Sequence, residues 1–256
     1  MSADFTTVTE LAGHRAHAEQ LSMIHTRYAL ARERCAGKDV LEAACGPGRG
    51  LGYLSQRARS VTAGDLTPAL VDAARRHYGE RVTLSVFDAQ ALPFADASFD
   101  LVLLYEAFYY LPKPEKFLAE ARRVLRPGGE LILSMPNPEW EGFNRSPYSV
   151  RYFSADELRA LLTANGFSAV VKCAFAAAPR GPIGLAVSAV RKAAVGLGVV
   201  PKTMKGKTWL KRAFYGPLAE LGPELDASAP VEPLAEAPAG PLPGFKMIYA
   251  LATRNP

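Results

Sequence analysis

The stretch Val40-Leu41-Glu42-Ala43-Ala44-Cys45-Gly46-Pro47-Gly48-Arg49-Gly50 joins a short apolar run to a turn with glycine at every second position. Such a run predicts a buried strand, and the glycines predict a tight turn that leads into a helix. Glycine lets the backbone approach a ligand closely, and the first N–H groups of the next helix are free to donate hydrogen bonds to it. The stretch therefore indicates a strand, a ligand-contacting turn and a helix, although the glycines would equally serve close strand-helix packing.

Short apolar runs alternate with helical patterns on both sides of this turn, from Lys38 to Pro136. This alternation predicts repeated strand-helix units that form a parallel sheet. We expect strands at 39–43, 61–64, 82–87, 100–105 and 130–135, and helices at 49–58, 68–77 and 114–125. The last helix should stop at Arg126-Pro127-Gly128-Gly129, because proline cannot continue a helix.

Downstream of this core, Ser154 precedes an apolar-periodic helix expected over 157–165, which Gly166 ends. Two further strands are expected at 168–175 and 245–253. The sequence thus predicts an α/β fold, with a seven-stranded, mostly parallel sheet and helices on both faces. Its core comprises residues 38–178 plus 244–256.

Two segments fall outside the predicted core. Residues 1–37 form an N-terminal helical cap, in which 14–35 are expected to make one amphipathic helix or two. Residues 179–243 form an insertion before the last strand, a possible substrate lid whose part from 221 to 243 is rich in proline and should be an irregular loop or flap. Basic residues between Arg191 and Arg212 would form either a solvated face or a site for an anionic group.

Composition restricts the class of protein. The chain has 256 residues, 49% of them hydrophobic, which fits one α/β domain with a modest appendage. A net charge of +5 without a basic run interleaved with aromatic residues does not favour nucleic acid as a partner. The three cysteines form no CxxC pair, and no apolar stretch approaches roughly 18 residues. We therefore expect a cytoplasmic protein without integral membrane contact, either monomer or homodimer.

The spacing of the glycines and a downstream acid narrow the choice of ligand. In the dinucleotide fingerprint G-x-G-x-x-G that starts at Gly46, the third glycine would fall on Leu51. Asp65 ends the next predicted strand, where its carboxylate could accept both hydroxyls of a ribose. A nucleoside with an amino-acid tail and no pyrophosphate fits both features, although a nicotinamide oxidoreductase on a related fold is the first alternative.

Five motifs in order resemble those of class I S-adenosylmethionine-dependent methyltransferases of the Rossmann-like type. They are Glu42 to Gly50, Asp65-Leu66, Asp88 to Phe94, Ser98 to Asp100 and Arg123 to Gly129, and the resemblance covers about residues 38 to 175. The chain looks most like the methyltransferase type 11/25 groups and bacterial small-molecule or sugar O-methyltransferases. The resemblance implies S-adenosyl-L-methionine as cofactor, with the glycine turn around its methionine part.

The resemblance also implies which residues bind the cofactor. Asp65 would hold the ribose, and Asp88 would accept a hydrogen bond from the adenine amine. The backbone N–H of Ala89 would donate to the adenine ring, and Leu66 would supply an apolar face for it. Glu42 would accept from the methionine ammonium, or else cap the glycine turn. The predicted cofactor-binding set is Glu42, Ala44, Gly46, Gly48, Asp65, Leu66, Asp88, Ala89 and Tyr105.

The run from Tyr105 to Leu111 follows the fourth strand and should face the transferred methyl group, because ligands bind beyond the carboxyl ends of parallel strands. Candidate catalytic residues are Glu106, Tyr109 and Tyr110. Glu106 would act as a general base only if burial raised its pKa, and would otherwise hydrogen-bond a ligand. The tyrosines could form a stacking surface, with one packed into the core. His14, His17 and His25 are further base candidates from the cap.

The same run also resembles a subgroup that methylates sugar or ribose hydroxyls with a divalent metal bound by Glu-x-x-Glu-His and a later histidine. Glu106 matches the first position, but Tyr109 and Tyr110 replace the Glu-His pair and Ser149 replaces the later histidine. This set is poor for a catalytic cation, so we predict a metal-independent site.

The predicted function is methyl transfer to a small-molecule acceptor, with the hydroxyl of a sugar or secondary metabolite as the favoured nucleophile. The loop 136–145, which contains Trp140, could line the acceptor site. A non-catalytic binding protein with the same fold is the second alternative.

Overall fold

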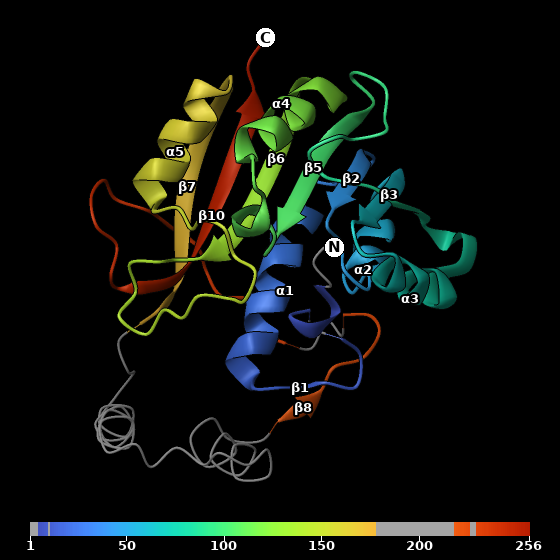
Figure 1. Ribbon diagram of the computed structural model, residues 1–256, viewed down its shortest axis with the longest axis horizontal. Coiled ribbons are helices and arrows are strands. Elements are labelled where there is room, and N and C mark those ends of the chain that lie inside the picture. The colour runs from blue at the N-terminus through green and yellow to red at the C-terminus, as the bar shows by residue number, and fades with distance from the viewer. Residues whose placement is uncertain (1–4, 10, 178–217, 226–228) are drawn as a thin grey trace.

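The computed structural model describes residues 5–9, 11–177, 218–225 and 229–256. A central sheet has the strand order β4-β3-β2-β5-β6-β10-β7-β9 (Figure 1). Its strands are β2 (Asp39–Ala43), β3 (Ser60–Asp65), β4 (Thr83–Val86), β5 (Phe99–Tyr105), β6 (Leu125–Pro136), β7 (Phe167–Ala176), β9 (Ala235–Glu236) and β10 (Phe245–Arg254). The strands from β4 to β6 are parallel, and β10 runs antiparallel to both β6 and β7. The predicted α/β fold is confirmed, with the two-residue β9 added at one edge.

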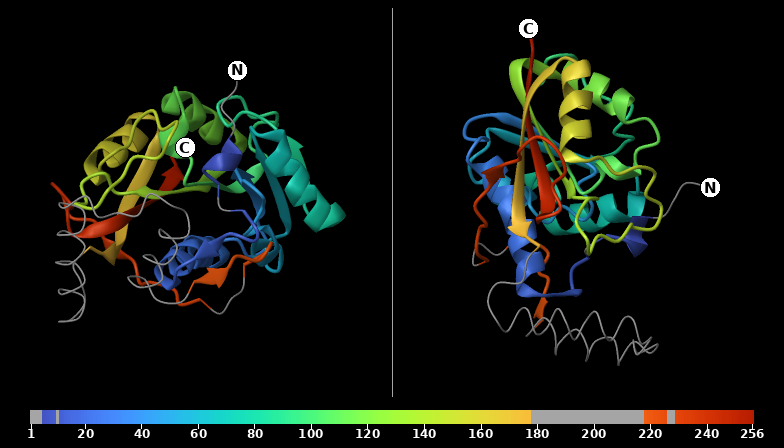
Figure 2. Two further views of the ribbon diagram at one scale, coloured as in Figure 1. Left: turned by 60° about the horizontal axis from the view of Figure 1, so that its bottom comes forward. Right: turned by 90° about the vertical axis from the view of Figure 1, so that its left-hand side faces the viewer.

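Helices cover both faces of the sheet (Figure 2). One core cluster packs α4 (Pro114–Val124) and α5 (Ala155–Ala164) on one face. The other packs α1 (Ala18–Arg32), α2 (Leu51–Ser55) and α3 (Pro68–Tyr78) on the opposite face. Short 3-10 helices occur at η1 (Phe5–Thr7), η2 (Gly79–Arg81) and η3 (Phe108–Tyr110), and β1 (Arg15–Ala16) pairs with β8 (Ala219–Glu220).

Burial on both faces explains the continuous apolar run of β5. Leu101 and Leu103 belong to the cluster that contains α1 to α3, whereas Val102 and Leu104 belong to the cluster that contains α4 and α5. Successive side chains of a strand point to opposite faces, so a strand covered on both sides needs apolar residues at every position. The apolar run therefore lasts as long as the strand is covered. The polar residues that follow it lie beyond the carboxyl end of β5.

Local signals located several elements well. Ser154 and Glu157 form the expected capping box of α5, with Ser154 Oγ accepting from Glu157 N at 3.2 Å and Glu157 Oε2 accepting from Ser154 N at 2.9 Å. The helix predicted over 49–58 is shorter and covers only Leu51–Ser55. The helix predicted over 114–125 ends at Val124, as the sequence Arg126 to Gly129 indicated, and Gly128 has a φ of +75°. These residues also form an irregular start of β6. There Phe99 pairs with Leu125, and Leu101 pairs with Glu130.

The described part of the cap contains one α-helix, α1, and His14 lies outside it. The predicted amphipathic pattern, with one apolar face, does not hold for the second half of α1, because Tyr28 to Ala31 are all buried. The outer face is covered by the insertion: Ser22 Oγ donates to Pro230 O at 2.7 Å, and Thr26 Oγ1 accepts from Glu232 N at 2.9 Å. The sequence pattern gave no sign of this second partner, because it comes from about 200 residues downstream.

The described part of the insertion is irregular apart from β8 and β9, as its proline-rich composition predicted, and it packs on the core. Leu225 N donates to Arg49 O at 2.9 Å, and Arg49 Nη1 donates to Gly222 O at 2.7 Å. Leu242 N donates to Glu139 Oε2 at 2.9 Å. The basic cluster between Arg191 and Arg212 lies outside the described residues. Within the described ranges, none of the helices combines the length and the apolar character that crossing a membrane requires.

Gly50 allows α1 to approach the glycine turn. A Cβ at this position would lie 2.0 Å from the ring of Tyr28, which is buried and cannot move aside without leaving its hydrogen bond to Glu42. We expect Gly50→Ala to lower the free energy of unfolding by about 1 to 3 kcal/mol through overpacking. Urea unfolding measures the effect, with Gly244→Ala as the control because nothing lies within 4 Å of its added Cβ. Equal stability of the two variants would contradict this account.

Candidate active site

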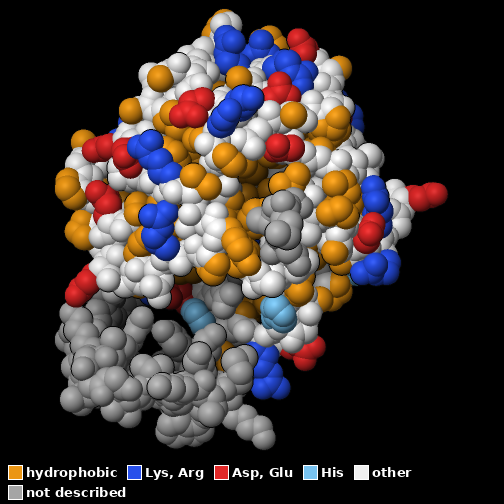
Figure 3. All heavy atoms as spheres, in the orientation of Figure 1, with side chains coloured by type: hydrophobic (Ala, Val, Ile, Leu, Met, Phe, Trp, Pro, Cys, Tyr) orange, Lys and Arg blue, Asp and Glu red, His pale blue; other side chains and the backbone are white. Residues whose placement is uncertain are grey.

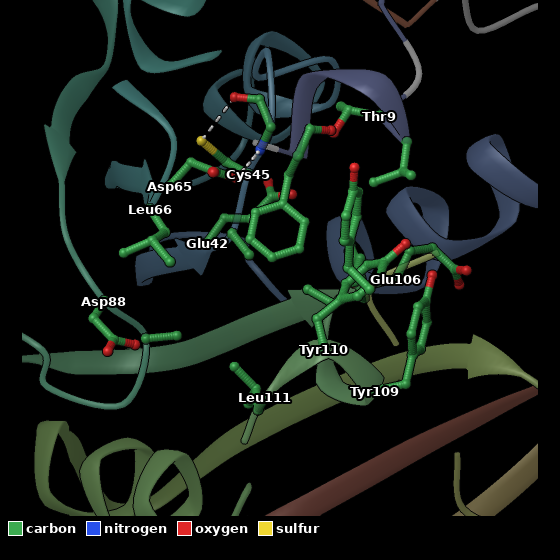
Figure 4. Close-up of a pocket in the computed structure, with 18 of the residues that line it drawn as sticks. Thr9, Glu42, Cys45, Asp65, Leu66, Asp88, Glu106, Tyr109, Tyr110 and Leu111 are labelled. Carbon is green, nitrogen blue, oxygen red and sulfur yellow. Dashed lines mark hydrogen bonds between the residues drawn. The ribbon is translucent and has the colours of Figure 1, made fainter. Parts of the chain in front are cut away.

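A cavity of about 540 Å³ lies where the parallel strands β2, β3 and β5 end (Figure 4). Its wall contains most of the predicted site residues, namely Glu42, Ala44, Gly46, Asp65, Leu66, Asp88, Ala89, Tyr105, Glu106, Tyr109 and Tyr110. In Figure 4, Asp65, Leu66 and Asp88 lie on one side, and Glu106 and Tyr109 lie on the other. The fold therefore brings together residues from four separate sequence motifs.

The first two glycines of the turn, Gly46 and Gly48, have different surroundings. Gly46 has a φ of +57° and lines the cavity, where an added Cβ would lie 3.2 Å from Thr9. Gly48, with a φ of +78°, is not on the cavity wall. A Cβ there would lie 2.8 Å from Leu51 and 3.1 Å from Tyr78. The ligand-facing interpretation therefore suits Gly46, and Gly48 serves the close packing of α2 and α3.

Asp65 ties the ends of two neighbouring strands together. Its Oδ2 accepts from Gly46 N at 3.0 Å, and its Oδ1 accepts from Thr67 N at 2.9 Å. Burial raises the pKa of this carboxyl, while the two backbone donors act in the opposite direction. Each carboxylate oxygen can accept a second hydrogen bond, so Asp65 can hold the turn and still accept from ligand hydroxyls.

Glu42 presents a buried carboxylate oxygen at the end of β2. Tyr28 Oη donates to its Oε1 at 2.6 Å, whereas its Oε2 has no hydrogen-bond partner among the described residues. Burial raises the pKa of Glu42 to about 7. A buried carboxylate oxygen without a partner is costly, and here it borders the cavity. Glu42 is therefore arranged to meet a cationic or hydrogen-bond-donating group of a ligand.

The side of the cavity predicted for adenine has a fixed acid and an apolar wall. Asp88 Oδ1 accepts from Gln90 N at 2.8 Å, which orients the carboxylate. Ala89 is buried, and Leu66 is 45% exposed although it is a large apolar residue. An exposed leucine on a cavity wall, next to a carboxylate, suits a flat base with polar edges.

Glu106 lies directly after β5 and is held in an unusual backbone conformation. Its φ is +53°, and Ser134 Oγ donates to its Oε1 at 3.2 Å. Among the described residues, five other than glycine have a positive φ, and three of these, Ala44, Glu106 and Tyr148, line the cavity. Such strain persists only where surrounding structure enforces it, and it concentrates at functional sites.

The two adjacent tyrosines have separate roles. Tyr109 is buried in the core and stacks on Tyr152, with ring centroids 4.4 Å apart and an interplanar angle of 16°. Burial raises the pKa of Tyr109 well above its usual value, which disfavours it as a general base. Tyr110 is half-buried, and its hydroxyl shares a 2.5 Å hydrogen bond with Ser146 Oγ. The expectation that one tyrosine packs inward applies to Tyr109.

Tyr105 and the cap histidines take structural positions. Tyr105 Oη donates to Arg27 O at 2.9 Å, which fastens α1 to the end of β5. His17 caps α1 by accepting from Gln20 N, and His25 is hydrogen-bonded to Ala229 O. None of His14, His17 and His25 is on the described cavity wall, so they are not placed as bases.

The sequence reasoning missed part of the wall. Phe5, Val8 and Thr9 come from the N-terminal segment, and Tyr148 and Val150 come from the loop before α5. The predicted loop 136–145 is not on the wall; its Trp140 ring faces Lys246, whose Nζ lies 5.5 Å from the ring centroid. The first segment belongs to no recognisable motif. The second contains Ser149, which stands at the later-histidine position of the metal-dependent subgroup, and this resemblance was the available signal.

Within the described residues, no group of three or more His, Cys, Asp and Glu side chains is placed to hold a metal ion. Independence from metal stays a prediction, supported by the replacement of the Glu-His pair by Tyr109 and Tyr110.

Comparison with known proteins shows similarity to methyltransferases. Residues 41–133 match the family described as a methyltransferase domain. The chain is 38% identical over 144 residues to a probable S-adenosylmethionine-dependent methyltransferase of Mycolicibacterium smegmatis. The aligned region covers 55% of this chain and 56% of that relative. The chain is also 39% identical over 113 residues to a fatty-acid O-methyltransferase of the same organism, covering 41% of each. The chain spans about half the length of the curated relatives it matches first.

A solved structure shares the fold. An S-adenosylmethionine-dependent methyltransferase from Thermotoga maritima, described as a possible histamine N-methyltransferase, superimposes with a TM-score of 0.58 at 19% identity, covering 93% of this chain and 94% of that one. The fold is thus that of class I methyltransferases. The match to the methyltransferase-domain family covers residues 41–133, which contain the glycine turn and the end of β5.

Glu42 offers a test of the buried carboxylate. Its pKa is raised from 4.5 to about 7, so the folded protein retains this proton more strongly than the unfolded chain. The resulting stabilisation is fully present below the unfolded pKa of 4.5 and is lost as the pH rises through about 7. We expect Glu42→Gln, which cannot ionise, to gain stability relative to the wild type between about pH 5 and about pH 8.

Urea unfolding at several pH values measures this difference. Glu33→Gln is the control, because it makes the same chemical change at a side chain that is 75% exposed. A constant difference between Glu42→Gln and wild type across this range would show that Glu42 keeps an ordinary pKa in the folded protein.

Proposed function

We propose that this protein is an S-adenosylmethionine-dependent methyltransferase that acts, without a metal ion, on the hydroxyl of a small-molecule acceptor such as a sugar or a secondary metabolite. The observation that carries the proposal is the unpartnered Oε2 of Glu42 on a cavity that Asp65 and Asp88 also line. These three carboxylates lie in the sequence order in which the matched family would use them for the methionine, ribose and adenine parts.

The residues present fit this cofactor. Glu42 would accept from its ammonium, Asp65 from its ribose hydroxyls, and Asp88 from its adenine amine. The absence of a side chain at Gly46 leaves room beside the turn. The cavity volume of about 540 Å³ lies in the range of small-molecule sites. When bound, the cofactor supplies an electrophilic methyl group on a cationic sulfur.

The opposite side of the cavity has to align the acceptor and deal with its proton. Methyl transfer is an in-line displacement, so the acceptor oxygen must be held on the axis of the breaking bond. Glu106 is the acidic side chain on this side of Figure 4, and Ser134 fixes one of its oxygens. We assign to Glu106 the task of accepting the proton of the acceptor hydroxyl, with simple hydrogen bonding to the acceptor as the alternative.

Two observations support an oxygen nucleophile and a methyl donor. A relative that is 39% identical to this chain over 113 residues is named a fatty-acid O-methyltransferase. The glycine spacing disfavours the nicotinamide alternative, because Leu51 stands where the third glycine of the dinucleotide motif would be needed. The strained backbone of Glu106 after β5 also disfavours the second alternative, a non-catalytic binding protein with the same fold, because such strain clusters at active sites.

Calorimetry with S-adenosylhomocysteine tests the cofactor. We expect the protein to bind it, to ignore NAD, and to lose about 1 to 3 kcal/mol of binding free energy in Asp65→Ala through the lost ribose contacts. Asp72→Ala serves as a matched control for the loss of a carboxylate. Asp72 lies on the solvent-facing side of α3, where its carboxylate forms a surface ion pair with Arg75. Binding of NAD in place of S-adenosylhomocysteine would overturn the proposal.

Turnover of Glu106→Gln tests the proton acceptor. With methyl-labelled S-adenosylmethionine, a panel of phenols and sugars, and a chelator present throughout, we expect the variant to lose about 10²-fold or more in kcat. Its affinity for S-adenosylhomocysteine should stay close to that of the wild type. Tyr110→Phe, which removes only a hydroxyl that is bonded to Ser146, should keep most of its turnover. Full activity of Glu106→Gln would remove Glu106 from the mechanism.

A further inference from the structure

The chemistry of the acceptor can be narrowed, on the basis of the proposed function, from the wall opposite the cofactor residues. We call this wall the acceptor half. Besides Glu106 and Tyr109, it contains a group of six residues, namely Phe5, Val8, Tyr110, Leu111, Tyr148 and Val150. Every one of these six side chains is apolar or aromatic. In Figure 3 hydrophobic side chains also gather in the middle of the face over the ends of β2 and β5, and most charged side chains lie nearer its rim.

Three aromatic rings of the acceptor half come from three separate parts of the chain. The ring of Phe5 lies 5.2 Å from that of Tyr110 and 6.1 Å from that of Tyr148, measured between centroids. The rings are tilted or edge-on to one another, at 58° and 80°. Tyr148 is 54% exposed and is held at a φ of +65°, so an aromatic side chain is kept at the mouth against its ordinary preferences.

The cavity wall carries four carboxylates, those of Glu42, Asp65, Asp88 and Glu106, and two arginines, Arg27 and Arg49. Arg49 donates to Gly222 O, and the charge of Arg27 acts on the Glu42 carboxylate. Glu106 is the charged side chain that the described structure places with the tyrosines. An anionic acceptor would therefore meet more negative than positive side chains on this wall. A sugar would find few partners for its several hydroxyls, because the Tyr110 hydroxyl is already bonded to Ser146.

We propose that the acceptor is a neutral aromatic compound with a hydroxyl on its ring, bound with the ring among Phe5, Tyr110 and Tyr148 and the hydroxyl toward Glu106. In the reaction, the acceptor oxygen forms a bond to the methyl carbon as the carbon–sulfur bond breaks. The sulfonium becomes a neutral thioether, and the hydroxyl proton passes to the Glu106 carboxylate. A phenol suits this arrangement because its pKa near 10 is well below that of a sugar hydroxyl, which makes the proton easier to remove.

The N-terminal segment links the two halves of the cavity. Thr9 lies against Gly46 of the glycine turn and donates from Oγ1 to Phe5 O at 2.7 Å, while Phe5 packs on Tyr110. This contact chain makes the position of Phe5 sensitive to what fills the cofactor half. The acceptor should therefore bind better once the cofactor half is occupied.

The test is calorimetric titration of the full chain with three probes in the presence of saturating S-adenosylhomocysteine. The probes are 2-naphthol, its carboxylate analogue 2-naphthoate, and methyl β-glucopyranoside. We expect 2-naphthol to bind about tenfold or more tightly than 2-naphthoate, and the glucoside to show no binding. Phe5→Ala and Tyr148→Ala should each weaken 2-naphthol binding about fivefold to tenfold, and Tyr148→Ala should leave the affinity for S-adenosylhomocysteine unchanged.

A matched control is Val170→Ala, because Val170 is 45% exposed on β7 and is not on the cavity wall. Equal or tighter binding of 2-naphthoate or the glucoside, or failure of 2-naphthol to bind, would overturn the acceptor proposal and leave the methyltransferase proposal intact. Loss of 2-naphthol binding in Val170→Ala as large as in Tyr148→Ala would overturn the assigned location. Failure of S-adenosylhomocysteine to bind would overturn both proposals.

Discussion

The hydrogen bond from Tyr28 to Glu42 joins the N-terminal helix to the edge of the sheet where the cavity lies. It depends on Gly50, because any side chain there would collide with the tyrosine ring. It also decides which carboxylate oxygen is left over, since Tyr28 takes Oε1 and Oε2 borders the cavity. Helix position, glycine turn and ligand-facing charge are thus one linked arrangement, in which the glycine matters for packing and for function together.

The two acids of the cofactor half differ in what they do before a ligand arrives. Both oxygens of Asp65 already accept from backbone N–H groups, so this acid contributes to the shape of two turns. Glu42 has one committed oxygen and a pKa raised to about 7 by burial. The protein therefore holds one carboxylate satisfied and another poorly satisfied within the same cavity, and the second has more to gain from a cationic group.

The sequence predicted the sheet, its helices and the cofactor half of the cavity, because short apolar runs and turn residues report on local structure. Of the acceptor half, it predicted only the part that follows β5, which contains Tyr110 and Leu111. Phe5, Tyr148 and Val150 were not predicted, because they reach the cavity through contacts made by the finished fold. Gly48 shows the opposite failure: it lies inside the strongest motif, yet its surroundings are helix side chains. The covered outer face of α1 was missed for the same reason, because its partner is the distant insertion.

The position of β10 sets an order of assembly. This strand follows the insertion in the chain, yet it lies between β6 and β7 and bonds to both. During synthesis, β7 emerges long before the strand that connects it to the sheet. The segment from β2 to β6 can form its parallel pairs before β10 has been made. β7 and α5 wait for a contact that closes a loop of some seventy residues between β7 and β10. The carboxyl ends of β2, β3 and β5, where the cavity lies, can therefore be arranged in a nascent chain in which β7 is still unpaired.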